Sequence, residues 1–332
     1  MKADKTAPET DKEPKTAHPR ETFSLVGHEE AEAALADGLR SGRMHHAWLL
    51  AGPKGLGKAS LAYRLARVAL GARAQGPRPL DVDPEDPIAR RINAMAHPDL
   101  FVLRRGLNER TGRPKRDIAV DEARALGQFF SLAPAEGGMR VAIIDAVDDL
   151  NRNSANAILK TLEEPPARSV LLLVCHAPGA ALATIRSRCR RLPLRPLSDD
   201  DVRSALGGDA NDALVRLARG RPGRAIALHA QGADSNPADL ERDLDAIARG
   251  EARRALPALY ERFSGEPFER FAATMELAGE RARIAGAESE AWAEAWTALE
   301  ALRVEAEDLD MDPRHALARA IGVLDRAAAA RR

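Results

Sequence analysis

Residues 52–60 read Gly-Pro-Lys-Gly-Leu-Gly-Lys-Ala-Ser and nearly complete the pattern G-x-x-x-x-G-K-[ST] of a phosphate-binding loop. Gly52, Gly57 and Lys58 occupy the positions that the pattern requires. Ala59, however, stands where the pattern needs a hydroxyl that holds magnesium. The stretch therefore predicts a P-loop that lacks its magnesium-binding side chain.

The sequence around this loop alternates between short apolar segments and helical patterns. Residues 47–51 predict a strand before the loop, and residues 60–70 place apolar side chains at helical spacing after it. Further strands are expected at 100–103, 141–144 and 169–175, with helical stretches between them. Strands that alternate with helices indicate an α/β fold with a mostly parallel sheet and helices on both faces.

A second ATPase position is altered in a matching way. The apolar segment 141–144 ends in Asp145, as the Walker B strand of an ATPase does, and Ala146 follows it. Many ATPases place a glutamate at that next position, where it activates the attacking water. Asp145 either contacts magnesium, as in an active relative, or only caps nearby N–H groups at the strand end. The chain thus keeps the scaffold of an ATPase and lacks two groups that hydrolysis needs.

The composition excludes several classes of protein. Fifty basic and fifty acidic residues give no net charge, so any contact with nucleic acid must come from a local patch. The two cysteines, Cys175 and Cys189, form no C-x-x-C pair, which excludes a zinc knuckle and a disulfide framework and predicts a cytoplasmic protein. No purely apolar segment is long enough to span a membrane.

The sequence divides into four parts. Residues 1–21 are rich in Lys, Glu, Thr and Pro and predict a disordered tail. The alternating strands and helices occupy residues 22–195, which we assign to a nucleotide-binding-like domain. A small helical lid is expected at 196–235, and residues 236–332 predict an all-helical C-terminal domain.

Five strings carry a resemblance to a known family. They are His-His-Ala-Trp-Leu-Leu at 45–50, the loop at 52–58, His-Pro-Asp-Leu at 97–100, Asn-Ala-Ile-Leu-Lys-Thr-Leu-Glu-Glu-Pro-Pro at 156–166 and Ser-Arg-Cys at 187–189. With these strings the chain resembles the subunits of the bacterial DNA polymerase III clamp loader, which are members of the AAA+ superfamily. The resemblance covers residues 23–195. It implies an AAA+ P-loop domain followed by a helical lid and a helical collar domain.

Within that family the chain is more similar to the delta-prime subunit than to the motor subunit, tau/gamma. A motor subunit needs a hydroxyl, an acid and a polar sensor at positions where this chain has Ala59, Ala146 and Cys175 or His176. The resemblance implies a subunit that does not hydrolyse ATP, joins the motor and delta subunits through its collar and helps them load the sliding clamp onto primed DNA. The alternative is a self-sufficient AAA+ ATPase of the motor type, which an ATPase assay on the purified protein would distinguish.

Arg188, in the Ser-Arg-Cys string, is the expected catalytic residue. In the family this arginine reaches into the nucleotide site of the neighbouring subunit as an arginine finger. A planar, permanently charged guanidinium suits the charge that develops on a γ-phosphate. Two alternatives remain: Arg188 is an ordinary surface arginine, or it faces DNA phosphates together with the rest of a basic run, Arg186, Arg190, Arg191 and Arg195.

A nucleotide in this chain would be held by the residues of the loop itself, Gly52, Gly55, Gly57 and Lys58. The loop either binds ATP or ADP without hydrolysis or is vestigial and empty. Arg224, in Gly-Arg-Pro-Gly-Arg at 220–224, matches the family's sensor 2, which contacts the subunit's own nucleotide; the alternative is that it only holds the lid against the core. No cofactor is required. No zinc is expected either, because many relatives carry four zinc-binding cysteines before the position of Phe101 and this chain has none there.

Overall fold

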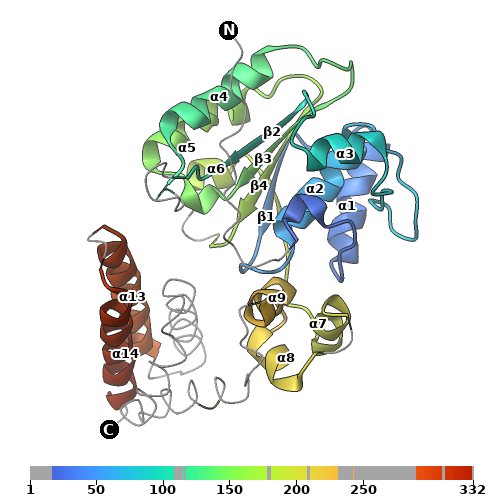
Figure 1. Cartoon of the computed structure of the whole chain (residues 1–332). Coiled ribbons are helices and arrows are strands. Elements are labelled where there is room, and N and C mark those ends of the chain that lie inside the picture. The colour runs from blue at the N-terminus through green and yellow to red at the C-terminus, as the bar shows by residue number, and fades with distance from the viewer. Residues whose placement is uncertain are drawn as a thin grey trace. The chain divides into compact units, whose positions relative to one another are not determined.

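The structure is a computed structural model, and it describes residues 17–107, 115, 117–177, 181–207, 210–230, 242, 289–308 and 311–330. The chain forms two compact units, Met1–Gly232 and Ala233–Arg332 (Figure 1).

Residues 17–21 belong to the segment for which disorder is expected, yet Pro19–Glu21 form a short 3-10 helix, η1. The side chain of His18 caps this helix by accepting a hydrogen bond from the Arg20 N–H. The remainder of the predicted tail lies outside the described residues.

A parallel sheet forms the centre of the first unit, with the strands in the order β2-β3-β4-β1-β5. The strands are β1 (Ala47–Ala51), β2 (Leu100–Arg104), β3 (Arg140–Asp145), β4 (Ser169–Cys175) and β5 (Arg190–Pro193). The predicted α/β class with a parallel sheet is confirmed. β5 was not predicted. It is an edge strand in which only Leu192 is buried, so its arginine-rich sequence resembles that of a loop.

Two layers of helices cover the sheet (Figure 1). One layer contains α1 (Glu29–Arg40), α2 (Lys58–Ala69) and α3 (Pro87–Asn93), and the other contains α4 (Val120–Ser131), α5 (Arg152–Glu163) and α6 (Ala183–Arg186). Alternate side chains of β1 illustrate the division. Trp48 and Leu50 pack with α1 and α2, whereas Ala47 and Leu49 pack with α4 and α5. Both faces of the strands are apolar for this reason, as in buried parallel sheets generally.

Three short helices follow the sheet and have a small core of their own. They are α7 (Asp199–Ala205), α8 (Asp212–Ala218) and α9 (Pro222–Ala230). Val202, Val215 and Ala225 from the three helices are fully buried against one another. Ser198 caps α7 by accepting a hydrogen bond from the Asp201 N–H, and three aspartates in the first turn favour the positive helix start.

In the second unit the structure describes two helices that pack against each other, α13 (Ser289–Asp308) and α14 (Pro313–Ala329). Both helices have buried apolar side chains, such as Trp292 and Leu299 in α13 and Ile321 and Leu324 in α14. Arg319 holds both oxygens of Glu305 at 2.6 and 2.8 Å. Most of the predicted helical domain at 236–288 lies outside the described residues. Within the described part of the chain, no helix is both long and apolar enough to cross a membrane.

Candidate functional site

The P-loop, residues 52–58, connects β1 to α2 with backbone angles that only glycine adopts readily. Gly55 has φ +90° and Gly57 has φ +79°. A Cβ on Gly57 would lie 2.5 Å from Cδ1 of Leu25, so this glycine also permits a close approach by another segment. The loop therefore has the strand–loop–helix setting that the sequence predicts.

The side chain of Lys58 folds back onto the loop and forms hydrogen bonds with its backbone. Its ammonium donates to the carbonyl oxygens of Gly52 and Pro53, each at 2.6 Å, and the side chain is buried. Burial lowers the pKa of Lys58 to about 8, while the carboxylates of Asp148 and Asp145 act in the opposite direction. These two bonds use two of the three N–H donors of the ammonium, so one donor remains for a phosphate oxygen.

The two positions with missing groups lie at the start of α2 and directly after β3. Ala59 is the second residue of α2, and Ala146 directly follows β3 and is only 2% exposed. Asp145 ends β3 and is half-buried; burial, followed by the charge of Asp149, raises the pKa of its carboxyl group. The site thus retains the acid that ends β3 and the ammonium of the loop. It has neither the hydroxyl nor the second acid of a hydrolytic centre.

Asp148 belongs to the same site and was not singled out from the sequence, whereas its neighbour His176 was considered only as the position of the polar sensor. Asp148 lies in η2 (Val147–Asp149) and accepts hydrogen bonds from the backbone N–H groups of His176 at 2.6 Å and Ala177 at 2.7 Å. It therefore ties the end of β4 to the segment after β3. Burial, assisted by the charge of Lys58, lowers the pKa of His176 to about 4. The sequence did offer a signal for Asp148, since Asp148 and Asp149 form an acidic pair shortly after the Walker B strand.

The first turn of α9 contacts the P-loop. The Gly223 N–H donates to the Gly55 carbonyl oxygen at 2.9 Å, and a Cβ on Gly55 would lie 3.0 Å from the Arg224 nitrogen. Arg224, the predicted sensor 2 residue, is thus placed beside the loop through its backbone. The structure brings together the loop glycines, Lys58, Asp145 and the start of α9 within one unit.

The segment before α1 also lies on the loop, and we call its residues 20–28 the N-terminal strap. Besides the contact of Leu25 with Gly57, the His28 Nε2 lies 3.0 Å from the Leu56 carbonyl oxygen. Burial is the largest cause of the lowered pKa of His28. The strap therefore forms one wall of the candidate nucleotide site.

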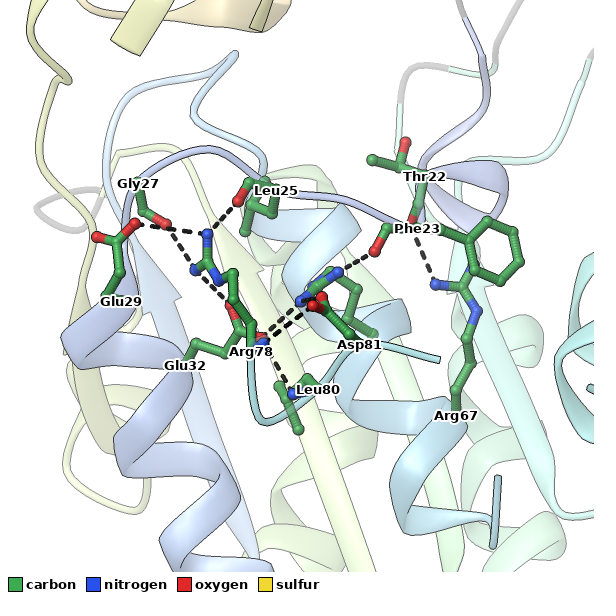
Figure 2. A network of polar contacts seen from close by, with 11 residues as sticks. Thr22, Phe23, Leu25, Gly27, Glu29, Glu32, Arg67, Arg78, Leu80 and Asp81 are labelled. Atoms are coloured by element: carbon green, nitrogen blue, oxygen red, sulfur yellow. Dashed lines mark hydrogen bonds and ion pairs between the residues drawn. The ribbon is translucent and has the colours of Figure 1, made fainter. Parts of the chain in front are cut away.

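Three buried or half-buried arginines fasten the strap through its backbone carbonyls (Figure 2). Arg67 donates to the carbonyls of Arg20 and Thr22, Arg64 to that of Phe23, and Arg78 to those of Leu25 and Gly27. The Arg67 guanidinium also stacks on the Phe23 ring, 3.9 Å from its centroid. Arg64 and Arg67 extend from α2, so the helix that begins at the P-loop also holds the strap above it.

Acidic side chains complete this network. Glu32 is fully buried and binds both Arg64, at 2.5 Å, and Arg78, while Asp81 binds Arg64 at 2.8 Å. The Glu32 carboxylate also accepts the Leu80 N–H at 3.1 Å. Periodicity alone did not reveal this network, because Arg64 and Arg67 look like solvent-facing residues of an amphipathic helix.

Arg188 follows α6 and lies in a separate group of contacts. Its Nη1 donates to the Thr184 carbonyl at 2.8 Å and to the Ser187 hydroxyl at 3.3 Å, and its Nη2 lies 2.6 Å from Glu163 Oε1. The side chain is 33% exposed. Among the described residues, Arg188 has no polar contact with the chain's own P-loop. Arg188 is therefore not one of the residues that surround this chain's own P-loop in the described structure.

The neighbouring basic residues and the cysteines have simpler surroundings. The Arg190 guanidinium lies over the Trp48 ring, 4.8 Å from its centroid, and Arg191 is exposed on the edge strand β5. Burial raises the pKa of both Cys175 and Cys189 to about 12, which does not suit a nucleophilic thiolate. The described part of the chain contains no cluster of three or more His, Cys, Asp or Glu that could hold a metal ion. The zinc content of the protein stays a prediction.

Comparisons with known proteins match this chain to subunits of DNA polymerase III. The model of the family described as DNA polymerase III, delta subunit, matches residues 27–198, slightly more than half of the chain. The delta' subunit of Pseudomonas aeruginosa is 37% identical over 194 residues, which cover 56% of this chain and 56% of that protein. The delta' subunit of Escherichia coli is 32% identical over 200 residues, which cover 58% and 57%.

A second group of relatives consists of tau subunits of DNA polymerase III. The tau subunit of DNA polymerase III from Salmonella typhimurium is 34% identical over 241 residues, which cover 72% of this chain and 35% of that protein. The matched region thus spans between about a third and somewhat more than half of the length of these relatives.

Proposed function

Because the chain belongs to the DNA polymerase III delta subunit family, we propose that it acts as a delta-prime-like subunit of the clamp loader. In this role it helps the motor (tau/gamma) and delta subunits to load the sliding clamp onto primed DNA and does not hydrolyse ATP itself. The observation that carries the proposal is an intact P-loop backbone with alanine at both 59 and 146.

The chemistry of hydrolysis explains why these two alanines matter. Catalysis of phosphoryl transfer depends on a metal held by the loop hydroxyl and on a residue that positions the attacking water. Ala59 provides no oxygen, and Ser60 cannot replace it, because one residue along a helix turns the side chain by about 100°. Ser60 is moreover buried in the core. Ala146 is buried as well and leaves no acid at the other position.

The contacts around the loop support a structural role for it. Lys58 donates to two loop carbonyls, α9 binds the loop at Gly55, and the strap packs on Gly57. These protein contacts support the shape of the loop. Bound ATP or ADP without hydrolysis remains part of the proposal, with Gly52, Gly55, Gly57 and Lys58 as the residues that would hold the phosphates.

The proposed catalytic contribution is made in trans by Arg188. Its guanidinium is partly exposed, and its contacts occupy the two Nη atoms but not Nε. N–H groups therefore remain for a phosphate on a neighbouring subunit. The C-terminal helices, including α13 and α14, would join the collar through which the subunits assemble.

A motor-type ATPase is the second candidate, since the tau relative matches the larger share of the chain. ATP turnover by the purified chain, alone and with motor and delta subunits, distinguishes the two. We expect no turnover from the chain alone and DNA-stimulated turnover with clamp loading from the complex. Omitting this chain from the complex should abolish loading. Turnover by the chain alone within the range of roughly 1–100 s⁻¹ typical of kinases would favour the motor-type function.

A further inference from the structure

We propose that Glu163 is a positioning residue for Arg188, holding its guanidinium in the orientation in which it meets a phosphate of the neighbouring subunit. This inference rests on the proposed role of Arg188 as an arginine finger. The contact that carries it is the short ion pair between Glu163 Oε1 and Arg188 Nη2, 2.6 Å apart. It joins the last residue of α5 to the residue two positions after α6.

The position of Glu163 makes this pairing meaningful. The C-terminal end of a helix carries partial negative charge from its unsatisfied carbonyl groups, so a carboxylate there is unfavourable without a cation beside it. Arg188 supplies that cation. Glu164 follows directly and is also exposed, and its carboxylate makes no hydrogen bond or ion pair with any described residue. One acid of the pair at the end of α5 is thus committed to Arg188 and the other is not.

Three acceptors fix the plane of the guanidinium. Nη1 donates to the Thr184 carbonyl and to the Ser187 hydroxyl, which itself donates to the same carbonyl at 3.1 Å. Nη2 pairs with Glu163. Because the guanidinium is flat and rigid, contacts on both Nη atoms define where its remaining N–H groups point. Without Glu163, only contacts within the chain segment 184–188 would orient the group.

The pair contributes little to folding, so its loss should be felt mainly in the reaction. Both side chains are partly exposed, with fractions of 33% for Arg188 and 48% for Glu163. Ion pairs of this kind add little to protein stability. The advantage of holding an arginine in advance is the rotamer entropy that need not be lost in the transition state. That entropy limits the expected effect to a decrease of about 5- to 30-fold at the affected site.

A competing role predicts the opposite sign. If Glu163 instead withheld Arg188 from the neighbouring site, its removal would release the arginine and raise the rate. The sign of the change therefore separates positioning from sequestration.

The test uses the assembled complex of this chain with motor and delta subunits, sliding clamp and primed DNA. We would measure kcat and KM for ATP with Glu163→Ala, Glu163→Gln, Arg188→Ala, the double variant with both alanines, and Glu164→Ala as the matched control. Glu163→Ala should lower kcat with KM within about twofold of the parent. The kcat of Glu163→Gln should lie between those of Glu163→Ala and the parent, because the glutamine amide oxygen still accepts a hydrogen bond from Arg188. Glu164→Ala should equal the parent.

The double variant gives the decisive comparison. If Glu163 acts only through Arg188, adding Glu163→Ala to Arg188→Ala should cause no further loss. An additive loss, an unchanged rate in Glu163→Ala, or an increased rate would each overturn the positioning role while leaving Arg188 as a finger. If Arg188→Ala itself hydrolyses ATP like the parent, the proposed function of Arg188 fails, and the positioning role fails with it.

Discussion

Gly223 donates its backbone N–H to the carbonyl oxygen of Gly55 at 2.9 Å, so that the first turn of α9 lies directly on the P-loop. The approach is close on both sides, since a Cβ on Gly223 would lie 3.1 Å from the Gly55 Cα. This bond joins the loop directly to a helix that follows the sheet in the sequence. The same contact places the predicted sensor 2 residue, Arg224, at the candidate site.

Replacing Gly55 should weaken this contact and destabilise the protein. Gly55→Ala introduces a Cβ 3.0 Å from the Arg224 nitrogen at φ +90°. Gly42→Ala is the matched control, since Gly42 has φ +65° but nothing within 4 Å of its added Cβ. Strained backbone costs on the order of 1–3 kcal/mol, and urea denaturation should show a larger loss for Gly55→Ala. Equal losses would mean that the loop and α9 move apart without cost.

Restoring the missing hydroxyl should restore a response to magnesium. In Ala59→Ser we expect Mg²⁺ to increase the thermal stabilisation by ADP, because the serine oxygen can bind the metal that bridges the phosphates. Ala59→Gly removes the methyl group without adding an oxygen and is the control. Identical shifts with and without Mg²⁺ in Ala59→Ser would indicate that the loop admits no metal-bound nucleotide.

The arginine network under the strap should depend on Glu32. Glu32→Ala leaves Arg64 without its fully buried partner and removes the Arg78 contact, and breaking a buried ion pair costs about 3–5 kcal/mol. Glu29→Ala is the control, because Glu29 meets Arg78 only at 3.5 Å and its side chain is 72% exposed. We expect a loss below about 1 kcal/mol for this variant. Similar unfolding free energies for the two variants would contradict the network shown in Figure 2.

Stability should decrease in mild acid partly because of His176. Burial lowers its pKa to about 4, and Lys58 adds to this effect while Asp148 opposes it. The unfolded side chain titrates near 6.5, so between pH 6.5 and 4 the unfolded state binds a proton that the folded state does not. Unfolding free energy therefore falls as the pH falls through this window.

The variant His176→Asn isolates this contribution. Burial also lowers the pKa of three histidines that both proteins retain, His28, His46 and His97. Only the difference between the two proteins reports His176. Urea denaturation at pH 7 and pH 5 should show a smaller loss in His176→Asn than in the parent. Parallel losses would show that His176 becomes protonated in the folded protein without penalty.

The fold was largely predictable because its signals are local. The run Val141 to Ile144 and the glycines of the loop determine strands and a turn within a few residues. Asp148 could not be placed in the same way, since its partners, His176 and Ala177, come from the next strand. The same holds for Glu163 and Arg188, which α5 and α6 bring together across 25 positions of sequence. Contacts between distant segments depend on packing that periodicity does not describe.

Arg191 is a better control for Arg188 than Arg190 is. Arg190 stacks on Trp48, so removing it would disturb the core as well as the charge. Arg191 is exposed on β5 and removes one positive charge from the same basic run. Arg191→Ala is therefore the better match for Arg188→Ala.

The most direct test of the account is ATP hydrolysis and clamp loading by the assembled complex with Arg188→Ala compared with Arg191→Ala, each at low and high salt. An arginine finger contributes about 10³–10⁵ in rate at its own site in GTPases, and a complex with several ATP sites loses less in total. We predict slower hydrolysis and loading with Arg188→Ala, at both salt concentrations and with normal assembly, and parental behaviour with Arg191→Ala. Parental activity in both variants, or an equal loss in both that low salt reverses, would contradict a finger and indicate a surface that contacts DNA phosphates.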